Sequence, residues 1–290
     1  MGEIDGRTTV VALLGDPVAH SLSPRMHNAA FAAAGLNWRY VAFRIPADEL
    51  AAAVRAVAAL GMAGCNVTIP HKEAACGAVD DLDPIAAHVG AVNTVRVTAG
   101  RLQGFNTDAS GVLDALTHDG GVELGGRAAV VIGAGGGARA ASFALASRAA
   151  RVTILNRTVS RARGLAQRVA AAQPHCAVDA ADLSAASIAA ALDGADVLIQ
   201  ATNATMSAAM GGGGGRAEWL VAVEKQLRRG MTVLDMVYTP ARTDLLAAAE
   251  QAGARAVSGL ALLVHQGARS FELWTGRPAP VDAMRTAVGQ

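Results

Sequence analysis

Residues 127–140 read RAAVVIGAGGGARA. The apolar run that ends at Ile132 predicts a buried strand, and the alanine-rich segment behind the glycines predicts a helix. In this context a GxGxxG/A pattern indicates dinucleotide binding, because glycine lets the backbone turn tightly and approach a pyrophosphate at the positive end of the helix. In a chain this rich in alanine and glycine, the same letters also suit an ordinary tight turn. The residues of this turn that would contact a dinucleotide are Gly133, Gly135, Gly136, Gly137 and Ala138.

The three residues that directly follow the next predicted strand bear on the choice of cofactor. Asn156, Arg157 and Thr158 stand where NAD-specific proteins usually carry an acid that binds both ribose hydroxyls. Arg157 can bind a 2′-phosphate bidentately, and Asn156 and Thr158 can donate hydrogen bonds to it. Arg161, one helical turn later, can add a second positive charge. This pattern favours NADP(H). The alternative is that Asn156 and Thr158 only cap the following helix while Arg157 is solvated.

The alternation of strands and helices predicts an α/β protein. Further strands at Val152–Leu155, Val197–Ala201 and Thr232–Asp235 are separated by helical segments, which predicts a parallel sheet wound with helices. The first hundred residues show the same rhythm and close with a hairpin. Asp108 is a good N-cap, so we expect a helix from Asp108 to His118 that enters the second domain. We therefore expect an N-terminal α/β domain over 1–107, a wound parallel domain over 108–258 and a helical segment over 259–290 that returns to the first domain.

Composition and charge limit the classes of partner. The chain carries 25 basic and 24 acidic side chains, interspersed, for a formal net charge of +1. Nucleic acids and anionic membranes need a concentrated basic face, so we expect a small soluble substrate instead. The sequence predicts neither a signal peptide nor a membrane span. Three scattered cysteines suit buried thiols in a reduced cytoplasm, and the histidines show no metal-ligand spacing, so we expect no metal.

Polar side chains of the first domain concentrate at the ends of predicted strands, where α/β sheets usually bind ligands. One loop carries two hydroxyls at alternating positions, which face the same way if the loop is extended and suit a carboxylate or a polyol. Another segment places an amide and a hydroxyl on one strand face and an amine at the following turn. Two more segments add amides and a carboxylate that local folding does not require. In chain order these residues are Ser21, Ser23, Asn66, Thr68, Lys72, Asn93, Asn106 and Asp108.

Eight segments, taken in order, resemble the shikimate dehydrogenase family over nearly the whole chain. They are GDPVAHSLSPRMHN (15–28), NVTIPHK (66–72), GAVNT (90–94), GFNTD (104–108), GAGGGARA (133–140), NRTVSRARGLA (156–166), DMVYTPARTDLL (235–246) and QGARSFELWTG (266–276). The resemblance implies a substrate domain, a Rossmann-type NADP-binding domain and a C-terminal helix that packs on the first domain. It also implies reversible reduction of 3-dehydroshikimate to shikimate with NADPH, a step toward chorismate and the aromatic amino acids.

The resemblance also implies roles for residues of this chain. Lys72 and Asp108 match the family's catalytic pair, with Lys72 as the general acid and Asp108 orienting it. Ser21 and Ser23 would bind the substrate carboxylate, with Tyr238 on that side. The ring hydroxyls would be held by Thr68, Asn93, Asp108 and Gln266, and Lys72 would also contact the substrate. The further cofactor contacts implied are Thr202, Asn203, Thr205, Val237 and Gly259.

One departure and two alternatives remain at this point. The family usually has Asn-Ala/Thr-Thr-x-x-Gly-Met near the nicotinamide, whereas this chain has Ala208 at the glycine position, which puts any assignment beyond Thr205 in doubt. A related enzyme for quinate or an aminated shikimate, NAD-linked, shares most of these motifs, although Arg157 and the two serines argue against it. A catalytically silent dinucleotide sensor is a second alternative, against which the Lys72 and Asp108 pair argues. The sequence leaves the oligomeric state open, a homodimer included.

Overall fold

The computed structural model describes residues 4–206 and 218–290 of the chain. The chain divides into two compact units, the first made of Met1–Gly111 and Leu263–Gln290 and the second of Val112–Leu262. The sequence places these limits at residues 107 and 258, so each change of unit falls slightly later along the chain than expected. Both changes lie inside helices, α4 (Thr107–Asp114) and α10 (Gly259–Thr275).

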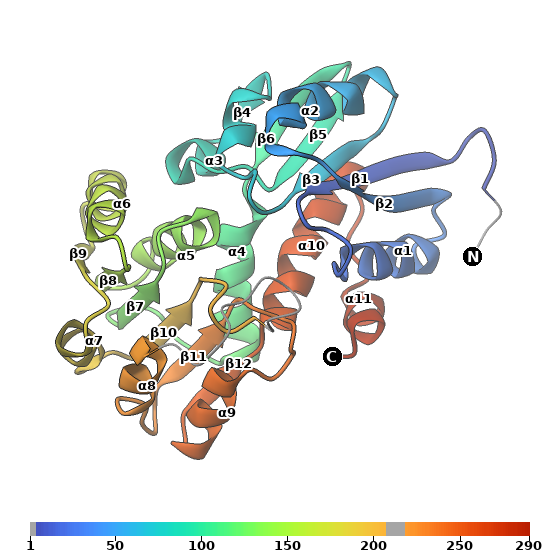
Figure 1. The fold of residues 1–290 in the computed structure, drawn as a ribbon. Helices are drawn as coiled ribbons and strands as arrows, with labels where there is room; N and C mark the ends of the chain where they lie inside the picture. The colour runs from blue at the N-terminus through green and yellow to red at the C-terminus, as the bar shows by residue number, and fades with distance from the viewer. Residues whose placement is uncertain (1–3, 207–217) are drawn as a thin grey trace. The chain divides into compact units, whose positions relative to one another are not determined.

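The first unit is built on a mixed six-stranded sheet (Figure 1). β1 pairs in parallel with β2 and β3, whereas β5 is antiparallel to both β3 and β6. The β5–β6 pair confirms the predicted hairpin. The strands lie in the order β2-β1-β3-β5-β6-β4, with the bounds Trp38–Arg44, Thr9–Gly15, Gly64–Val67, Thr94–Thr98, Arg101–Phe105 and Asp81–Leu82.

Helices pack against this sheet from both sides (Figure 1). Apolar residues of α2 (Leu50–Ala59) form a buried cluster with Leu14 of β1 and Val67 of β3. α1 (Ser23–Ala33) lies beside α11 (Val281–Val288), and Phe31 of α1 stacks on Phe271 of α10 with ring centroids 5.5 Å apart. The C-terminal residues are therefore part of the first unit. Its shorter elements are α3 (Pro84–Val89) and the 3-10 turns Ala47–Glu49 and Ala74–Gly77.

The second unit is built on a parallel six-stranded sheet in the order β12-β11-β10-β7-β8-β9. Three strands follow one another outward from β7 and three outward from β10, which is the doubly wound Rossmann order. The predicted fold class, α/β with a Rossmann-type domain, is confirmed. The bounds of β7 to β12 are Ala128–Ile132, Arg151–Leu155, Ala177–Ala181, Val197–Gln200, Thr232–Asp235 and Arg255–Val257.

Helices cover both faces of the second sheet (Figure 1). α5 (Gly136–Ala146) and α6 (Val159–Ala172) lie on one face, and α7 (Ala185–Leu192), α8 (Glu218–Glu224) and α9 (Asp244–Gln251) on the other. The strand order reverses between β7 and β10. The carboxyl ends of these two strands therefore border the crevice in which doubly wound sheets bind ligands.

The helix at Asp108 begins differently from the prediction. α4 starts at Thr107, and Asn106 caps it, because its Oδ1 accepts a hydrogen bond from the Ala109 N–H at 3.1 Å. The helix continues from Asp114 as a π-helical turn, Ala115–Asp119. The expectation that Asp108 is the N-cap was therefore wrong. Its carboxylate hydrogen-bonds to side chains from other elements of the first unit instead.

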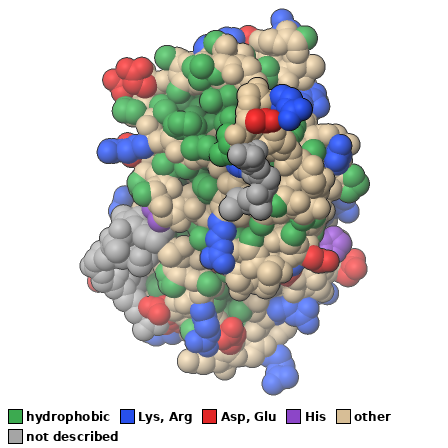
Figure 2. All heavy atoms as spheres, turned by 90° about the vertical axis from the view of Figure 1, so that its right-hand side faces the viewer, with side chains coloured by type: hydrophobic (Ala, Val, Ile, Leu, Met, Phe, Trp, Pro, Cys, Tyr) green, Lys and Arg blue, Asp and Glu red, His purple; other side chains and the backbone are tan. Residues whose placement is uncertain are grey.

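The surface combines scattered charges with an exposed apolar edge strand. On the face drawn in Figure 2, basic and acidic side chains are dispersed, and apolar side chains gather toward the top. β2 is an edge strand of the first sheet, and its Val41 and Phe43 side chains are 42% and 40% exposed. Within residues 4–206 and 218–290, no helix combines the length and the apolar character that crossing a membrane requires.

His27 lies in the core of the first unit. It is fully buried on α1, stacks on Tyr40 with ring centroids 4.5 Å apart, and lies 5.3 Å from the ring of Trp274. Neither ring nitrogen has a hydrogen-bond partner among the described residues. Burial lowers the pKa of His27 to about 3. The ring is therefore neutral in the folded protein at neutral pH.

We predict that His27 makes the fold sensitive to acid. The unfolded chain binds a proton at His27 below pH 6.5, whereas the folded chain does not until about pH 3, so the free energy of unfolding falls as the pH drops from 6.5 toward 3. Between pH 7 and pH 5 this loss is about 2 kcal/mol. His27→Phe should remove it, as measured by denaturant unfolding followed by tryptophan fluorescence at several pH values.

The exposed His175 supplies the matched control. His175→Phe should keep the wild-type dependence of unfolding free energy on pH. Parallel curves for wild type and His27→Phe across this range would show that His27 is not the acid-sensitive group.

Candidate active site

Lys72 and Asp108 form an ion pair in the first unit, with Lys72 Nζ 2.6 Å from Asp108 Oδ2. Lys72 lies in the turn after β3, and the Val92 N–H holds its backbone oxygen at 2.8 Å. The Lys72 side chain is 19% exposed and that of Asp108 only 6%. An ammonium group that is accessible at one end and held by a buried carboxylate at the other can exchange a proton with a bound molecule.

Asn93 engages the second oxygen of the same carboxylate. Its Nδ2 donates to Asp108 Oδ1 at 2.9 Å and to Thr107 Oγ1 at 2.9 Å, and its Oδ1 accepts from the Thr107 N–H at 2.8 Å. Gln266 of α10 lies at the edge of this group, where its Oε1 accepts from Asn93 Nδ2 at 3.4 Å. The structure thus brings together four of the residues singled out in the sequence, Lys72, Asn93, Asp108 and Gln266.

A residue that sequence reasoning missed, Ser270, joins α10 to this group. It is fully buried, and its Oγ lies 2.8 Å from Thr94 Oγ1, 3.2 Å from Thr107 Oγ1 and 3.1 Å from the Asn66 amide that donates to it. Asn66 also accepts from Tyr40 Oη at 2.7 Å. Its spacing from Gln266 could have indicated Ser270 in the sequence, because a residue four positions later lies on the same face of a helix.

The hydroxyl residues of the first unit are arranged differently from the expectation. Leu22, between Ser21 and Ser23, has the helical backbone angles φ −83° and ψ −9°, so the loop is not extended there. Ser21 Oγ accepts a hydrogen bond from the Ser23 N–H at 3.2 Å, and Ser23 begins α1. The argument from strand-like alternation therefore does not hold for this pair. Thr68 follows β3 directly and is half-buried, with its N–H bonded to Leu14 O at 2.9 Å.

The glycine-rich turn of the second unit has the geometry of a backbone cradle. Gly133 directly follows β7 and has φ +123°, a conformation that residues with side chains rarely adopt. A Cβ there would also lie 3.2 Å from Thr202 Cγ2, and a Cβ on Gly137 would lie 3.1 Å from Met236 Cε. α5 starts at Gly136, and its N-cap Gly135 offers no side-chain hydrogen bond. The first N–H groups of α5 are therefore not capped by a side chain, as an anion site requires.

The segment after β8 is exposed in part. Arg157, Thr158 and Arg161 are exposed, and no ion pair is seen for Arg157 within residues 4–206 and 218–290. Asn156 Nδ2 donates to Thr158 O at 2.9 Å, while Thr158, the N-cap of α6, makes no side-chain cap. Asn156 thus shapes the turn, and the capping alternative does not describe Thr158.

Three of the predicted cofactor residues after β10 and β11 belong to one hydrogen-bond network, namely Thr202, Thr205 and Val237. Asp235, which ends β11, accepts from Thr205 Oγ1 at 3.1 Å and from the Val237 N–H at 3.0 Å. Burial raises the pKa of Asp235 to about 6, against the lowering effect of these hydrogen bonds. Gly259 is a glycine for a steric reason, because a Cβ there would lie 2.5 Å from Val237 O.

Two predicted residues have other surroundings. Asn203 is exposed, and Tyr238 is half-buried and lies in the second unit rather than with the other substrate residues of the first. Ala208, the departure from the family pattern, lies outside the described residues. Among the residues that the structure describes, no three His, Cys, Asp or Glu side chains group as a metal site would need.

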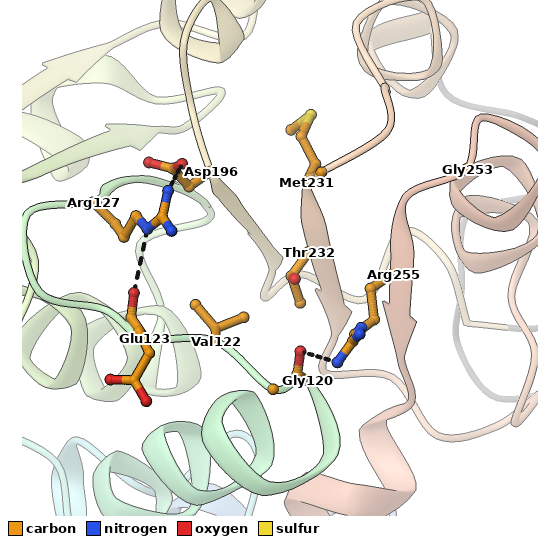
Figure 3. Close-up of a pocket in the computed structure, with 11 residues that line it drawn as sticks. Gly120, Val122, Glu123, Arg127, Asp196, Met231, Thr232, Gly253 and Arg255 are labelled. Atoms are coloured by element: carbon orange, nitrogen blue, oxygen red, sulfur yellow. Dashed lines mark hydrogen bonds and ion pairs between the residues drawn. The ribbon is translucent and has the colours of Figure 1, made fainter.

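A separate hollow of about 330 Å³ lies in the second unit, at the amino ends of β7, β10, β11 and β12 (Figure 3). Arg127 binds Asp196 at 2.9 Å, and Arg255 donates to Gly120 O at 2.9 Å, so both guanidinium groups have protein partners. It lies at the opposite edge of the sheet from the glycine-rich turn. Its lining residues are Gly120, Gly121, Val122, Glu123, Arg127, Asp196, Gly230, Met231, Thr232, Gly253 and Arg255.

Family models match three segments of the chain. Residues 13–95 match the shikimate dehydrogenase substrate binding domain, residues 116–210 the shikimate/quinate 5-dehydrogenase model, and residues 259–288 the shikimate 5′-dehydrogenase C-terminal domain. The segments lie in both compact units, and the first holds Lys72 and Asn93.

Similar proteins span nearly the whole chain. A shikimate dehydrogenase (NADP+) of Methanopyrus kandleri is 47% identical over 98% of this chain and 96% of its own length. The crystal structure of Thermus thermophilus shikimate 5-dehydrogenase in complex with NADP(H) and shikimate is 36% identical, with a TM-score of 0.83 over 97% of this chain and 98% of that one. The Listeria monocytogenes enzyme in complex with shikimate and NAD is 32% identical, with a TM-score of 0.87 over 99% and 98%. The resemblance noted in the sequence is confirmed: this chain belongs to the shikimate dehydrogenase family.

Proposed function

We propose that this protein catalyses the reversible NADPH-dependent reduction of 3-dehydroshikimate to shikimate, in the pathway to chorismate and the aromatic amino acids. The observation that carries the proposal is the 2.6 Å pair of Lys72 Nζ and Asp108 Oδ2, buried at the carboxylate and accessible at the amine. Family membership supplies the substrate class. The pair supplies an acid suited to carbonyl reduction.

Lys72 acts as the general acid. When bound, NADPH supplies the hydride that reduces the carbonyl carbon. The Lys72 ammonium donates its proton to the carbonyl oxygen as negative charge develops there, and the neutral amine takes the proton back in the reverse reaction. Asp108 accepts a hydrogen bond from Lys72 Nζ and so fixes the direction of the amine. Asn93 occupies the other oxygen of Asp108, which keeps the carboxylate from rotating.

The remaining polar side chains would bind the substrate. Ser21 and Ser23 would bind the carboxylate, and Tyr238 would contact that side. A site built to bind several hydroxyls rejects analogues that lack them, because its own buried polar groups would be left unpaired. The groups proposed for the ring hydroxyls are Thr68, Lys72, Asn93, Asp108 and Gln266.

The second unit fits NADP(H). The turn Gly133–Ala138 suits a pyrophosphate, because a Cβ on Gly135 would meet nothing within 4 Å and the helix that follows has no side-chain cap. Arg157 and Arg161 are exposed beside β8, where a 2′-phosphate would lie, with Asn156 and Thr158. The nicotinamide side would be lined by Thr202, Asn203, Thr205, Val237 and Gly259.

We also propose a cytoplasmic location and a homodimer. Cys65, Cys76 and Cys176 are free thiols, as expected in a reducing compartment. The exposed Val41 and Phe43 side chains lie on β2, which is an edge strand, and a sheet edge can pair with a second copy. The free thiols support the cytoplasmic location and the edge strand supports the dimer, and neither argument depends on the proposed reaction.

Initial rates with a panel of substrates test the reaction. We expect a higher kcat/KM for shikimate with NADP+ than for quinate or an aminated shikimate with either coenzyme, followed by absorbance of the reduced nicotinamide. The family model that matches residues 116–210 is named for both shikimate and quinate, and the Listeria relative was crystallised with NAD. Quinate and NAD+ are therefore informative comparisons in this assay. A preference for quinate with NAD+ would overturn the substrate assignment.

Lys72→Met should lower kcat by about 10²–10⁴-fold, because the proton donor is lost while the apolar stem remains. Calorimetric binding of shikimate separates this loss from a loss of substrate affinity. The matched control is Lys225→Met, which changes the only other lysine of the chain, an exposed one. Equal rates for the two variants would exclude Lys72 as the acid and point to a different mechanism.

Arg157→Leu should weaken NADP+ binding by roughly 10- to 100-fold, since a charge-assisted hydrogen bond contributes about 1.5–3 kcal/mol. The affinity for NAD+ should stay within about 2-fold, because NAD+ has no 2′-phosphate. Arg168→Leu, at an exposed position on the same helix α6, is the control. If Arg157→Leu and Arg168→Leu bind NADP+ alike, Arg157 does not select the coenzyme.

Light scattering tests the dimer. Wild type should have twice the chain mass of 29.3 kDa, and Phe43→Glu should run as a monomer because a charge on the strand edge opposes pairing. Leu60→Glu, at a side chain 70% exposed after α2, should leave the mass unchanged. A monomeric wild type would overturn the proposal.

A further inference from the structure

We propose that Asp235 is the positioning residue of the nicotinamide side of the cofactor site: its buried carboxylate ties the segment after β10 to the segment after β11 and holds both against the glycine-rich turn. This inference rests on the proposed NADP(H) site in the second unit. It concerns a residue that would not touch the cofactor itself.

The carboxylate of Asp235 collects hydrogen bonds from three segments of the chain. Oδ1 accepts from Thr205 Oγ1 at 3.1 Å, from Gln200 Nε2 at 3.4 Å and from the Val237 N–H at 3.0 Å. Oδ2 accepts from Thr243 Oγ1 at 2.8 Å. Asp235 is fully buried, so no water can replace a lost partner without a rearrangement.

Gln200, which is hydrogen-bonded to Asp235, also binds residues in the segment after β10. It is also fully buried, and its Oε1 accepts from the Thr202 N–H at 2.6 Å. Its Nε2 donates to Thr202 O at 2.9 Å and to Thr205 Oγ1 at 2.9 Å. Gln200 thus holds both backbone groups of Thr202, and Thr205 is held by Gln200 and by Asp235. These two buried side chains stand at adjacent strand ends, which pair in parallel register.

The held segments are the ones that border the glycine-rich turn. A Cβ on Gly133 would meet Thr202, and a Cβ on Gly137 would meet Met236, the residue between Asp235 and Val237. On the other side, a Cβ on Gly259 would meet the backbone of Met236 and Val237. A shift of either segment would therefore change the space beside the turn, and Asp235 is hydrogen-bonded to both segments.

Support for the next helix is the competing explanation for this carboxylate. Thr243 is the N-cap of α9, where its Oγ1 accepts from the Leu246 N–H at 3.3 Å, and Asp235 orients that hydroxyl. This role would need only Oδ2. Three of the four hydrogen bonds reach Oδ1 from the other two segments, and burial makes a charge there costly. Fixing α9 alone would not require them.

Two ligands separate the nicotinamide side from the adenosine side. NADP+ spans the whole site, whereas adenosine 2′,5′-bisphosphate carries the 2′-phosphate but no nicotinamide. Asp235→Ala should raise the Kd for NADP+ by about 10-fold or more while the Kd for the bisphosphate stays within about 2-fold, both measured by calorimetry. Asp235→Asn, which keeps an acceptor oxygen at Oδ1, should restore most of the NADP+ affinity.

The control variant is Thr243→Val. It removes the hydrogen bond from Thr243 to Asp235 Oδ2, next to α9, and leaves the hydrogen bonds from the other two segments. It should lower the melting temperature without changing the ratio of the two Kd values. Thr205→Val, which removes one Oδ1 partner, should raise the Kd for NADP+ selectively and serves if Asp235→Ala does not fold.

Unchanged NADP+ binding in Asp235→Ala, or an equal loss for both ligands, would overturn the inference. The proposed cofactor site would still hold in that case if the wild-type protein binds both ligands. A wild-type protein that binds neither would overturn the cofactor site and this inference together.

Discussion

A buried carboxylate with both oxygens engaged is the constraint on which the first unit depends. Asp108 is almost inaccessible, and a charge in that position is tolerable only when it is paired and hydrogen-bonded. Lys72 supplies the charge and Asn93 the second hydrogen bond. Asn93 is in turn hydrogen-bonded to Thr107, and Thr107 to Ser270 of α10, so the network extends from Asp108 to that helix. The Lys72 amine is thus held by side chains that are themselves hydrogen-bonded to further residues, and such support keeps the geometry of a site fixed.

The same principle recurs in the second unit with a different outcome. Within residues 4–206 and 218–290, Asp235 forms no ion pair, and its four hydrogen-bond donors are neutral groups. Neutral donors compensate burial less well than an opposite charge, and the pKa of Asp235 is accordingly raised. One carboxylate therefore orients the Lys72 amine, while the other joins strand ends.

The sequence predicted local features well and distant partners poorly. The glycine-rich turn follows from a strand, a turn and a helix that adjoin along the chain, so residues 127–140 sufficed for it. The closeness of Lys72 and Asp108 came from family resemblance, because no local rule joins two residues on separate elements. The N-cap was misplaced since Asn106 and Asp108 are both good caps, and tertiary partners of Asp108 decided between them. Ser270 was missed because its partners lie on remote elements and a serine in a helix has many uses.

The discontinuity of the first unit has a consequence for synthesis. Its sheet is translated first, yet Ser270 and Gln266 come from Leu263–Gln290, after the whole of the second unit. A chain emerging from the ribosome can complete the second unit while the first still lacks the helix that closes its polar cluster. The unit that holds Lys72 and Asp108 is therefore the last to be completed, although its sheet is made before the second unit.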